Sequence, residues 1–198
     1  MFMNFENYES FLNILMQDIE AIFEHQKDFI FCKKGCTHCC QNGEYPFTEI
    51  EFKYLLQAFK NLNQNTKDII TNNIKNLKQN EQGYYSCPFL INNSCSVYQQ
   101  RGLVCRTFGL LIENASGKIE GPFCGKLGLN YSNIYDKETK LLQINKIENN
   151  EFKKLPKAFK LDISNIINLS LVKDLDLEFG EQKSLLQWLK EYEHEILS

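Results

Sequence analysis

The sequence contains no apolar run that approaches the length of a membrane span. Its first residues also lack the basic segment and the unbroken apolar stretch of a secretory signal. We therefore expect no membrane partner and a location in the cytoplasm, where cellular reductants keep thiols reduced. A formal net charge of -3 gives no sign of a nucleic-acid-binding surface, so we expect no nucleic-acid partner.

Motifs of the common enzyme classes are missing as well. The sequence has no Walker A loop, no glycine-rich dinucleotide fingerprint and no Ser-His-Asp pattern. Its carboxylates lie on amphipathic faces, where solvation explains them, so no general acid or base stands out. Catalysis, if present, would belong to a metal, and the sequence leaves open whether the protein is an enzyme.

Arginine is scarce, because only Arg101 and Arg106 are arginines among the 22 cationic residues. Both lie close to cysteines, whereas lysine serves everywhere else. The planar guanidinium carries five donors in a fixed fork. We expect the two arginines to hold backbone carbonyls, a carboxylate or the sulfurs of a cluster.

Glycine and proline are scarce outside the middle of the chain. Nine of the ten glycines and three of the four prolines lie within residues 35–128, which indicates a loop-built centre between two helical ends. The length of 198 residues suits one domain. We predict a mainly α fold, as a small helical domain with a loop-rich cysteine-cluster centre and one short β-hairpin. Residues 1–198 form this single domain, with a metal-binding core at about 30–128 and a helical scaffold at 1–29 and 129–198.

Apolar residues with a period near 3.6 predict most of the helices. Thr48 and Glu51 fit a capping box at the start of the second one, and Ser96 and Gln99 fit another. Asn92-Asn93-Ser94 is a turn signal that would bring Cys87 and Cys95 together. Helices are predicted over residues 5–31, 49–59, 65–78, 97–101, 141–147, 161–172 and 180–197, and a hairpin over 110–120.

Cysteine is abundant, and it occurs in two groups of four. We interpret all eight thiols as metal ligands that meet at one centre or two, because thiolate suits both zinc and the irons of an iron-sulfur cluster. Cys124, which stands alone, has the alternative of being a buried and inert thiol. The predicted ligands are Cys32, Cys36, Cys39, Cys40, Cys87, Cys95, Cys105 and Cys124.

The adjacent pair Cys39-Cys40 raises a separate question. Side chains of adjacent residues point apart in most backbone conformations, so we expect these two thiols to have different roles: ligands of two metals, or one ligand and one supporting or redox thiol. His38 is either a fourth ligand beside three cysteines or a partly exposed loop residue.

Cys32, Cys36 and Cys39 have the Cys-x-x-x-Cys-x-x-Cys spacing that radical S-adenosylmethionine enzymes use to hold a cluster. Such enzymes need a partial barrel of parallel strands after the motif, and here helical patterns follow it. The spacing nevertheless favours iron-sulfur over zinc.

Several of these segments carry a family resemblance. The segments are Cys36-x-x-Cys39-Cys40, Cys87-Pro88-Phe89-Leu90, Cys95-Ser96-Val97-Tyr98, Arg101 and Cys105-Arg106. Together, over about residues 30–125, they resemble the YkgJ-type cysteine-cluster family, which implies a zinc- or iron-chelating domain. The chain departs from the family pattern at Gly102, where proline is common, and in the three residues between Cys32 and Cys36, where two are usual.

The same cysteine arrangement is similar to that of flagellin lysine N-methylases, which implies an iron-sulfur cluster and S-adenosylmethionine. Two functions follow as hypotheses. One is a protein that binds zinc or iron, with an iron-sulfur cluster favoured. The other is an enzyme that transfers methyl groups from S-adenosylmethionine. The partner expected from the sequence is a metal ion or cluster. The sequence leaves open whether there is a protein partner.

Overall fold

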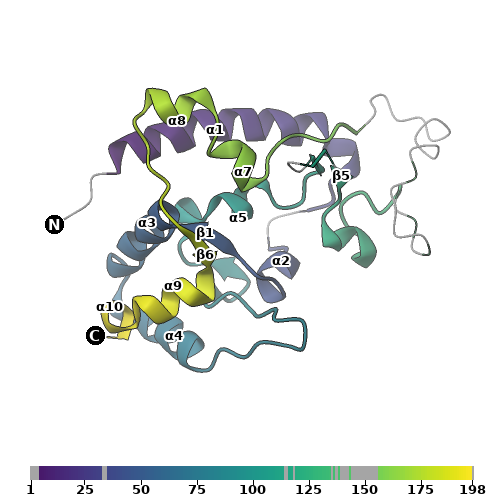
Figure 1. The fold of residues 1–198 in the computed structure, drawn as a ribbon. Coiled ribbons are helices and arrows are strands. Elements are labelled where there is room, and N and C mark those ends of the chain that lie inside the picture. The colour runs from purple at the N-terminus through teal and green to yellow at the C-terminus, as the bar shows by residue number, and fades with distance from the viewer. Residues whose placement is uncertain are drawn as a thin grey trace. The chain divides into compact units, whose positions relative to one another are not determined.

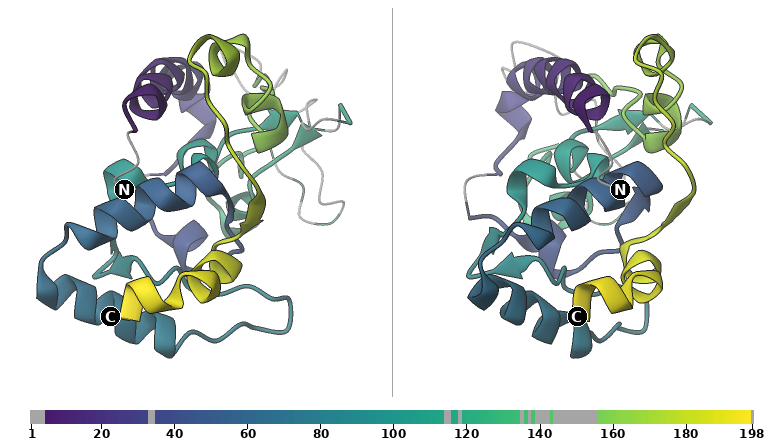
Figure 2. Two further views of the ribbon diagram at one scale, coloured as in Figure 1. Left: turned by 60° about the vertical axis from the view of Figure 1, so that its left-hand side comes forward. Right: turned by 90° about the vertical axis from the view of Figure 1, so that its left-hand side faces the viewer.

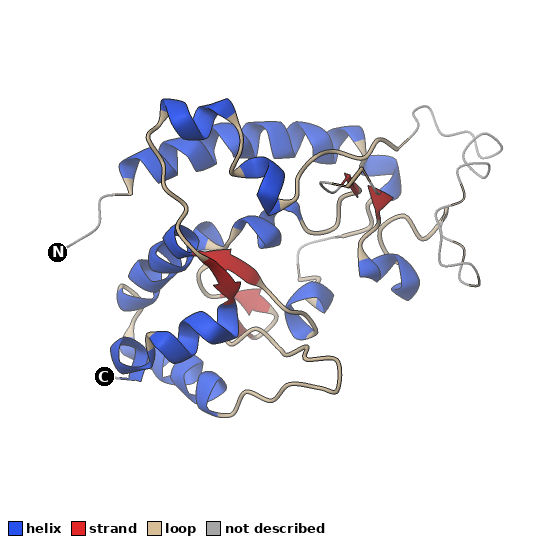
Figure 3. Ribbon diagram, in the orientation of Figure 1, coloured by secondary structure: helices blue, strands red, loops and turns tan. Residues whose placement is uncertain are grey.

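The computed structural model describes residues 5–32, 35–113, 116–117, 119–134, 136, 138, 143 and 156–197. The chain divides into two compact units. The first unit is Met1–Lys34 with Thr107–Leu177, and the second unit is Gly35–Arg106 with Glu178–Ser198. Helices supply most of the regular structure and strands are short (Figures 1 and 3), so the prediction of a mainly α protein is confirmed. The single-domain organisation stays a prediction.

The first unit begins with its longest helix. The predicted helix over residues 5–31 is confirmed as far as His25, and a separate 3-10 turn follows it. The predicted hairpin is confirmed by the antiparallel pair β4 and β5. Its elements are α1 (Glu6–His25), η1 (Lys27–Phe29), β4 (Ile112–Glu113), β5 (Ile119–Glu120), η3 (Phe123–Leu127), α7 (Ile163–Ile166) and α8 (Ser170–Asp174).

A small core joins distant segments of the first unit. The rings of Phe29 and Tyr131 stack with their centroids 6.0 Å apart, and Leu111 and Ile134 are buried with them. The backbone N–H of Tyr131 donates to the carbonyl of Phe29 over 2.6 Å, and that of Leu111 donates to the Tyr131 hydroxyl over 3.2 Å. The segment after α1 is thereby fixed against residues that lie about a hundred positions later in the sequence.

The prediction of one continuous helix over 161–172 is wrong. Asp162 does cap α7, since its carboxylate accepts a 2.9 Å hydrogen bond from the backbone N–H of Asn165. The helix then ends after Ile166, and α8 starts only after the extended residue Leu169, with φ -62° and ψ 145°. Of the helix predicted over 141–147, only residue 143 lies within the described residues, so this helix stays a prediction.

The two longest helices of the second unit are α3 (Glu49–Lys60) and α4 (Gln64–Lys75). The capping box of Thr48 and Glu51 is confirmed at the start of α3, and the chain reverses between α3 and α4 (Figure 2). Its elements are α2 (His38–Gln41), β1 (Pro46–Thr48), α3 (Glu49–Lys60), α4 (Gln64–Lys75), β2 (Leu90–Ile91), β3 (Ser94–Cys95), η2 (Tyr98–Gln100), α5 (Leu103–Thr107), β6 (Gln182–Ser184), α9 (Leu185–Glu191) and α10 (Glu193–Leu197). The last residue of α5 belongs to the first unit.

Two helix predictions in this unit need correction. The segment predicted as helical from 180 starts with strand β6, which pairs antiparallel with β1, and α9 begins only at Leu185 behind a capping box of Ser184 and Gln187. The segment 97–101 is a 3-10 turn. Its expected capping box is absent because the Ser96 hydroxyl instead donates to the carbonyl of Phe89 over 2.9 Å.

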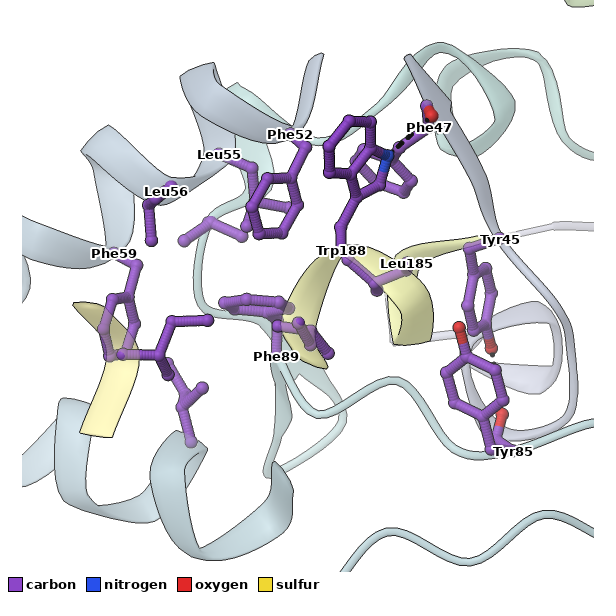
Figure 4. Close-up of a cluster of buried hydrophobic side chains, with 14 residues drawn as sticks. Tyr45, Phe47, Phe52, Leu55, Leu56, Phe59, Tyr85, Phe89, Leu185 and Trp188 are labelled. Atoms are coloured by element: carbon purple, nitrogen blue, oxygen red, sulfur yellow. Dashed lines mark hydrogen bonds between the residues drawn. The ribbon is translucent and has the colours of Figure 1, made fainter. Parts of the chain in front are cut away.

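An aromatic core fills the second unit. Trp188 stacks on Phe52 with ring centroids 5.5 Å apart, and its indole N–H donates to the Phe47 carbonyl over 2.9 Å (Figure 4). The hydrogen bond satisfies the one polar group of a side chain that is 2% exposed. The core residues are Tyr45, Phe47, Phe52, Leu55, Leu56, Phe59, Ile70, Tyr85, Phe89, Val97, Leu185, Trp188, Leu189 and Ile196, with Cys87, Cys95 and Cys105 packed against them.

In the ranges given above, no helix is both long enough and apolar enough to cross a bilayer.

Candidate metal centre

The first pair of thiols sits on a single helical turn. The backbone N–H groups of Cys40 and Gln41 donate to the Thr37 carbonyl over 2.8 and 2.9 Å, which closes the turn of α2. The sulfurs of Cys39 and Cys40 lie 4.0 Å apart, so the expectation that they point apart is wrong. Two thiolates on one tetrahedral ion, at Zn–S bonds of about 2.3 Å, have sulfurs about 3.8 Å apart. The pair is therefore spaced like two ligands of one ion.

Backbone hydrogen bonds attach the second cysteine segment to α2. The N–H of Cys87 donates to the Cys40 carbonyl over 2.7 Å, and Gly43 and Tyr85 exchange two hydrogen bonds of 3.2 and 3.1 Å. The Tyr45 hydroxyl lies 2.9 Å from the Cys39 carbonyl and 3.3 Å from that of Tyr85. Thiols that are far apart in the sequence are thus held on adjoining backbone.

Cys95 reaches the same region through a tight hairpin. Strands β2 and β3 pair with Leu90 opposite Cys95, and the connecting Asn92 and Asn93 have φ of 49° and 58°. Asparagine tolerates this left-handed conformation better than most residues. The backbone N–H of Leu90 also donates to the Cys87 carbonyl over 3.0 Å. The predicted turn that brings Cys87 and Cys95 together is confirmed.

Cys105 is carried by α5, whose start is capped from another helix. The Glu51 carboxylate accepts hydrogen bonds from the backbone N–H of Leu103 over 2.6 Å and of Thr48 over 2.8 Å. Burial raises the pKa of the Glu51 carboxyl, and its hydrogen bonds to Thr48 and Leu103 oppose that shift, as does the charge of Arg106. A buried carboxyl with partners for both oxygens acts as a fixed acceptor in this position.

Both arginines hold backbone carbonyls, which is one of the three alternatives expected from the sequence. Arg106 is buried, and its guanidinium donates to the carbonyls of Arg101, over 3.0 Å, and of Gln99. Arg101 donates to the Tyr98 carbonyl over 2.6 Å, and its guanidinium carbon lies 3.8 Å from the centroid of the Tyr98 ring. The arginine pair therefore shapes the loop between Cys95 and Cys105.

Five thiols of the second unit lie close enough to affect one another's pKa or the pKa of Tyr45. Burial raises the pKa of Cys87, and the nearby Cys105, Cys95 and Cys39 raise it further. Burial raises the pKa of Cys105 to about 12, again with contributions from Cys95 and Cys39, while the charge of Arg101 opposes both this shift and the one at Cys95. The pKa of Tyr45 is raised by burial and then by Cys87, Cys40 and Cys105. We call Cys39, Cys40, Cys87, Cys95 and Cys105 the thiol cluster.

The thiol cluster is reduced and half-buried, and no disulfide joins its members. In the part of the chain that the structure describes, no three Cys, His, Asp or Glu side chains already stand at metal-binding spacing. The donor chemistry nevertheless fits zinc or iron, because both metals form sites in which every protein ligand is a cysteine thiolate. Cys36 is half-buried in the segment before α2, and His38 is exposed at its first turn.

The remaining two thiols belong to the first unit. Cys32 is exposed and Cys124 is buried, and their side chains are hydrogen-bonded to each other. This hydrogen bond, together with burial, raises the pKa of Cys124. The eight predicted ligands are therefore distributed over a thiol cluster of five, the nearby sequence position Cys36, and the Cys32–Cys124 pair.

The sequence was compared with known protein families. A family model named CxxCxxCC and described as a putative zinc- or iron-chelating domain matches residues 31–158, which is more than half of the chain. The chain belongs to the CxxCxxCC family. No curated protein and no solved structure matches it. Metal binding is thus the function that the family description supports.

The CxxCxxCC signature can be placed on the chain residue by residue. Its last three cysteines coincide with Cys36, Cys39 and Cys40, whereas Lys33 stands where the first would fall and Cys32 lies one position earlier. Two of the three matched cysteines belong to the thiol cluster. The departure concerns Cys32, whose thiol interacts with Cys124.

Proposed function

We propose that the protein binds zinc or iron through the thiol cluster, with Cys36 as a further ligand from the same unit. The observation that carries this proposal is the gathering of five reduced thiols from α2, the 87–95 hairpin and α5. Membership in a family described as zinc- or iron-chelating supports the same function. The full set of eight ligands predicted from the sequence is reduced in this proposal to the six of the second unit.

The residues around the thiol cluster bury its thiols and hold the segments that carry them. Metal binding removes the protons that burial keeps on Cys87 and Cys105, so the metal gains thiolates that have few competing partners. The aromatic core packs against three of the thiols and restricts their motion. The carbonyl-bound Arg106 and the capping Glu51 fix the position of α5, which carries Cys105.

The occupant of the centre is a single tetrahedral ion or an iron-sulfur cluster. The 4.0 Å separation of the Cys39 and Cys40 sulfurs favours one ion, zinc or iron, with both thiolates bound. An iron-sulfur cluster is the alternative occupant, because its irons are also held by cysteine thiolates. The five thiols of the thiol cluster, together with Cys36, supply enough ligands for either occupant.

Metal and acid-labile sulfide contents of protein prepared without oxygen test the proposal. Iron with matching sulfide and a brown colour identifies a cluster, stoichiometric zinc without colour identifies a zinc site, and iron without sulfide identifies a mononuclear iron site. Protein that contains none of these, and that takes up neither Zn²⁺ nor Fe²⁺ on addition, would refute metal binding.

Single cysteine variants assign the ligands. Cys39→Ser and Cys105→Ser should each lose metal and unfold at a lower temperature, because ligand formation and folding are coupled. Cys32→Ser, in the first unit, is the matched control and should keep its metal. Full metal content in both cluster variants would show that the ligands lie elsewhere.

A methyl transfer enzyme is the second candidate. It rests on the similarity of the cysteine arrangement to that of flagellin lysine N-methylases. Titration of the metal-loaded protein with S-adenosylmethionine in a calorimeter decides this point, and heat that vanishes in Cys39→Ser would support an enzyme. The thiols of the cluster form no disulfides, which suits a reducing compartment, so we also propose that the protein is cytoplasmic.

A further inference from the structure

Cys32 and Cys124 form a pair that the proposed metal centre does not use. They lie far apart in the sequence, at the end of the segment after η1 and within η3, yet their thiols are hydrogen-bonded. Both belong to the first unit, whereas the thiol cluster belongs to the second. The fold therefore brings together two thiols that lie far apart in the sequence and outside the thiol cluster.

A buried asparagine fixes both partners of the pair. The Asn130 side chain accepts hydrogen bonds from the backbone N–H groups of Phe31, over 2.9 Å, and of Cys32, over 3.0 Å, and it donates to the Gly109 carbonyl over 2.9 Å. The backbone of Asn130 also hydrogen-bonds the Cys124 thiol. Since Asn130 is fully buried, these bonds hold the two cysteines as one local arrangement.

Gly109 leaves the room that this arrangement needs. A Cβ at position 109 would lie 2.7 Å from the Asn130 amide nitrogen and 3.8 Å from the Cys32 sulfur. The first distance is too short for any side chain, and the glycine φ of 101° is one that other residues rarely adopt. The backbone thus approaches the Asn130 side chain closely beside the Cys32 thiol.

We propose that Cys32 and Cys124 are a dithiol that is reversibly oxidised to a disulfide. Two thiols fall short of the four ligands of a structural zinc site. Their exposures differ, as those of an attacking and a resolving cysteine do: Cys32 is exposed, and Cys124 is 4% exposed. An oxidant in solution reaches Cys32 first.

The oxidant is a small disulfide such as oxidised glutathione. The Cys32 thiolate attacks one sulfur of that disulfide, whose S–S bond breaks to release one glutathione thiol and leave Cys32 in a mixed disulfide. Cys124 loses its proton to solvent and attacks the Cys32 sulfur, which releases the second glutathione. Two electrons pass from the protein pair to the oxidant, so that one disulfide and two protein thiols become one protein disulfide and two glutathiones.

Equilibration of the metal-loaded protein in glutathione buffers of graded potential tests the proposal, with alkylation of free thiols and peptide mapping as the readout. We expect one protein disulfide, between Cys32 and Cys124, and a raised melting temperature, since the new bond constrains the unfolded chain. Cys124→Ala should stop at glutathione on Cys32, and Cys32→Ala should form no disulfide at Cys124. Pairing of Cys32 with Cys36, or no disulfide even in the most oxidising buffer, would overturn the proposal.

Metal content separates this site from the metal centre. The pair is independent of the proposed function, so oxidation should leave the bound metal in place, and Cys124→Ala should retain it. Loss of metal on formation of the disulfide would show that these two thiols are ligands and would overturn the assignment. Protein that holds no metal at all still tests the pair, because the disulfide is read by mass alone.

Discussion

The carboxylate of Glu51, in α3, accepts a 2.6 Å hydrogen bond from the backbone N–H of Leu103, the first residue of α5. The first N–H groups of a helix have no partner within it, and the residue before α5 is Gly102, which has no side chain to cap it. Glu51 therefore caps the helix that carries Cys105 while it also closes its own capping box with Thr48.

Replacement of this carboxylate should destabilise the protein and weaken metal binding together. In Glu51→Gln one acceptor oxygen becomes an N–H₂ donor, which leaves the N–H of Leu103 or of Thr48 facing another donor. The loss of a buried hydrogen-bond acceptor costs about 1–3 kcal/mol of unfolding free energy. Urea unfolding and competition with a chromophoric zinc chelator measure the two effects.

Glu20→Gln is the matched control for this substitution. Glu20 is an exposed glutamate on α1, and its replacement should change the unfolding free energy by less than about 0.5 kcal/mol. Equal effects of the two substitutions would show that the contact to Leu103 does not position α5.

The role of Glu51 marks how far the sequence predicts this structure. The capping box with Thr48 depends on residues three apart and was predicted, whereas the contact to Leu103 joins residues 52 apart and has no local signature. The same distinction explains the helix predicted over 161–172. Its apolar pattern was correct, but Leu169 is extended and divides it, and a pattern of side chains does not show a local change in backbone angles.

Replacement of Arg106 by lysine should lower the stability of the protein. The Arg106 fork reaches two carbonyls, those of Gln99 and Arg101, while a lysine ammonium at the end of a flexible chain does not reproduce that planar geometry. We expect Arg106→Lys to lower the unfolding free energy by about 1–2 kcal/mol, since a hydrogen bond from a charged group contributes about that much. Thermal unfolding provides the measurement.

Arg101→Lys supplies the comparison. Arg101 contacts one carbonyl and stacks on the exposed Tyr98, so its replacement should cost less than that of Arg106. A cost that is equal or larger would assign the main structural role to Arg101.

Gly102 should not tolerate a larger residue while Phe47 is present. A Cβ at this position would lie 2.7 Å from two carbons of the Phe47 ring and 3.1 Å from a carboxylate oxygen of Glu51. Gly102→Ala should therefore cost about 1–3 kcal/mol, the usual penalty for overpacking a core. Phe47→Leu removes the ring, so alanine at 102 should cost less in that background. A double-mutant cycle by urea unfolding measures the coupling, and strictly additive effects would contradict the contact.

The cysteine-bearing loops were predicted in part. The turn at Asn92 and Asn93 followed from residue types, because those residues act locally. A structural role for the two arginines was also expected, but the sequence left open whether they hold carbonyls, a carboxylate or sulfurs. The closeness of the Cys39 and Cys40 sulfurs did not follow from residue types, since it depends on the one helical turn of α2 that the Thr37 carbonyl closes. Nor did the pairing of Cys32 with Cys124, which Asn130 arranges through contacts about a hundred residues apart in sequence.

The stability of the metal-free protein should fall at alkaline pH. The pKa of Cys105 is raised from 9.0 to about 12 in the folded protein, chiefly by burial. Between these values the folded protein keeps the Cys105 proton while the unfolded chain has lost it, so rising pH favours unfolding. The contribution is fully present below pH 9 and declines by up to about 1.4 kcal/mol per pH unit above it.

Urea unfolding of chelator-treated protein from pH 8 to 10.5 should show this decline. Cys105→Ala should show a shallower decline, because the remaining slope then comes only from Cys87, Cys95, Cys124 and the buried tyrosines, whose pKa values are also raised. Identical slopes in the two proteins would contradict a raised pKa at Cys105.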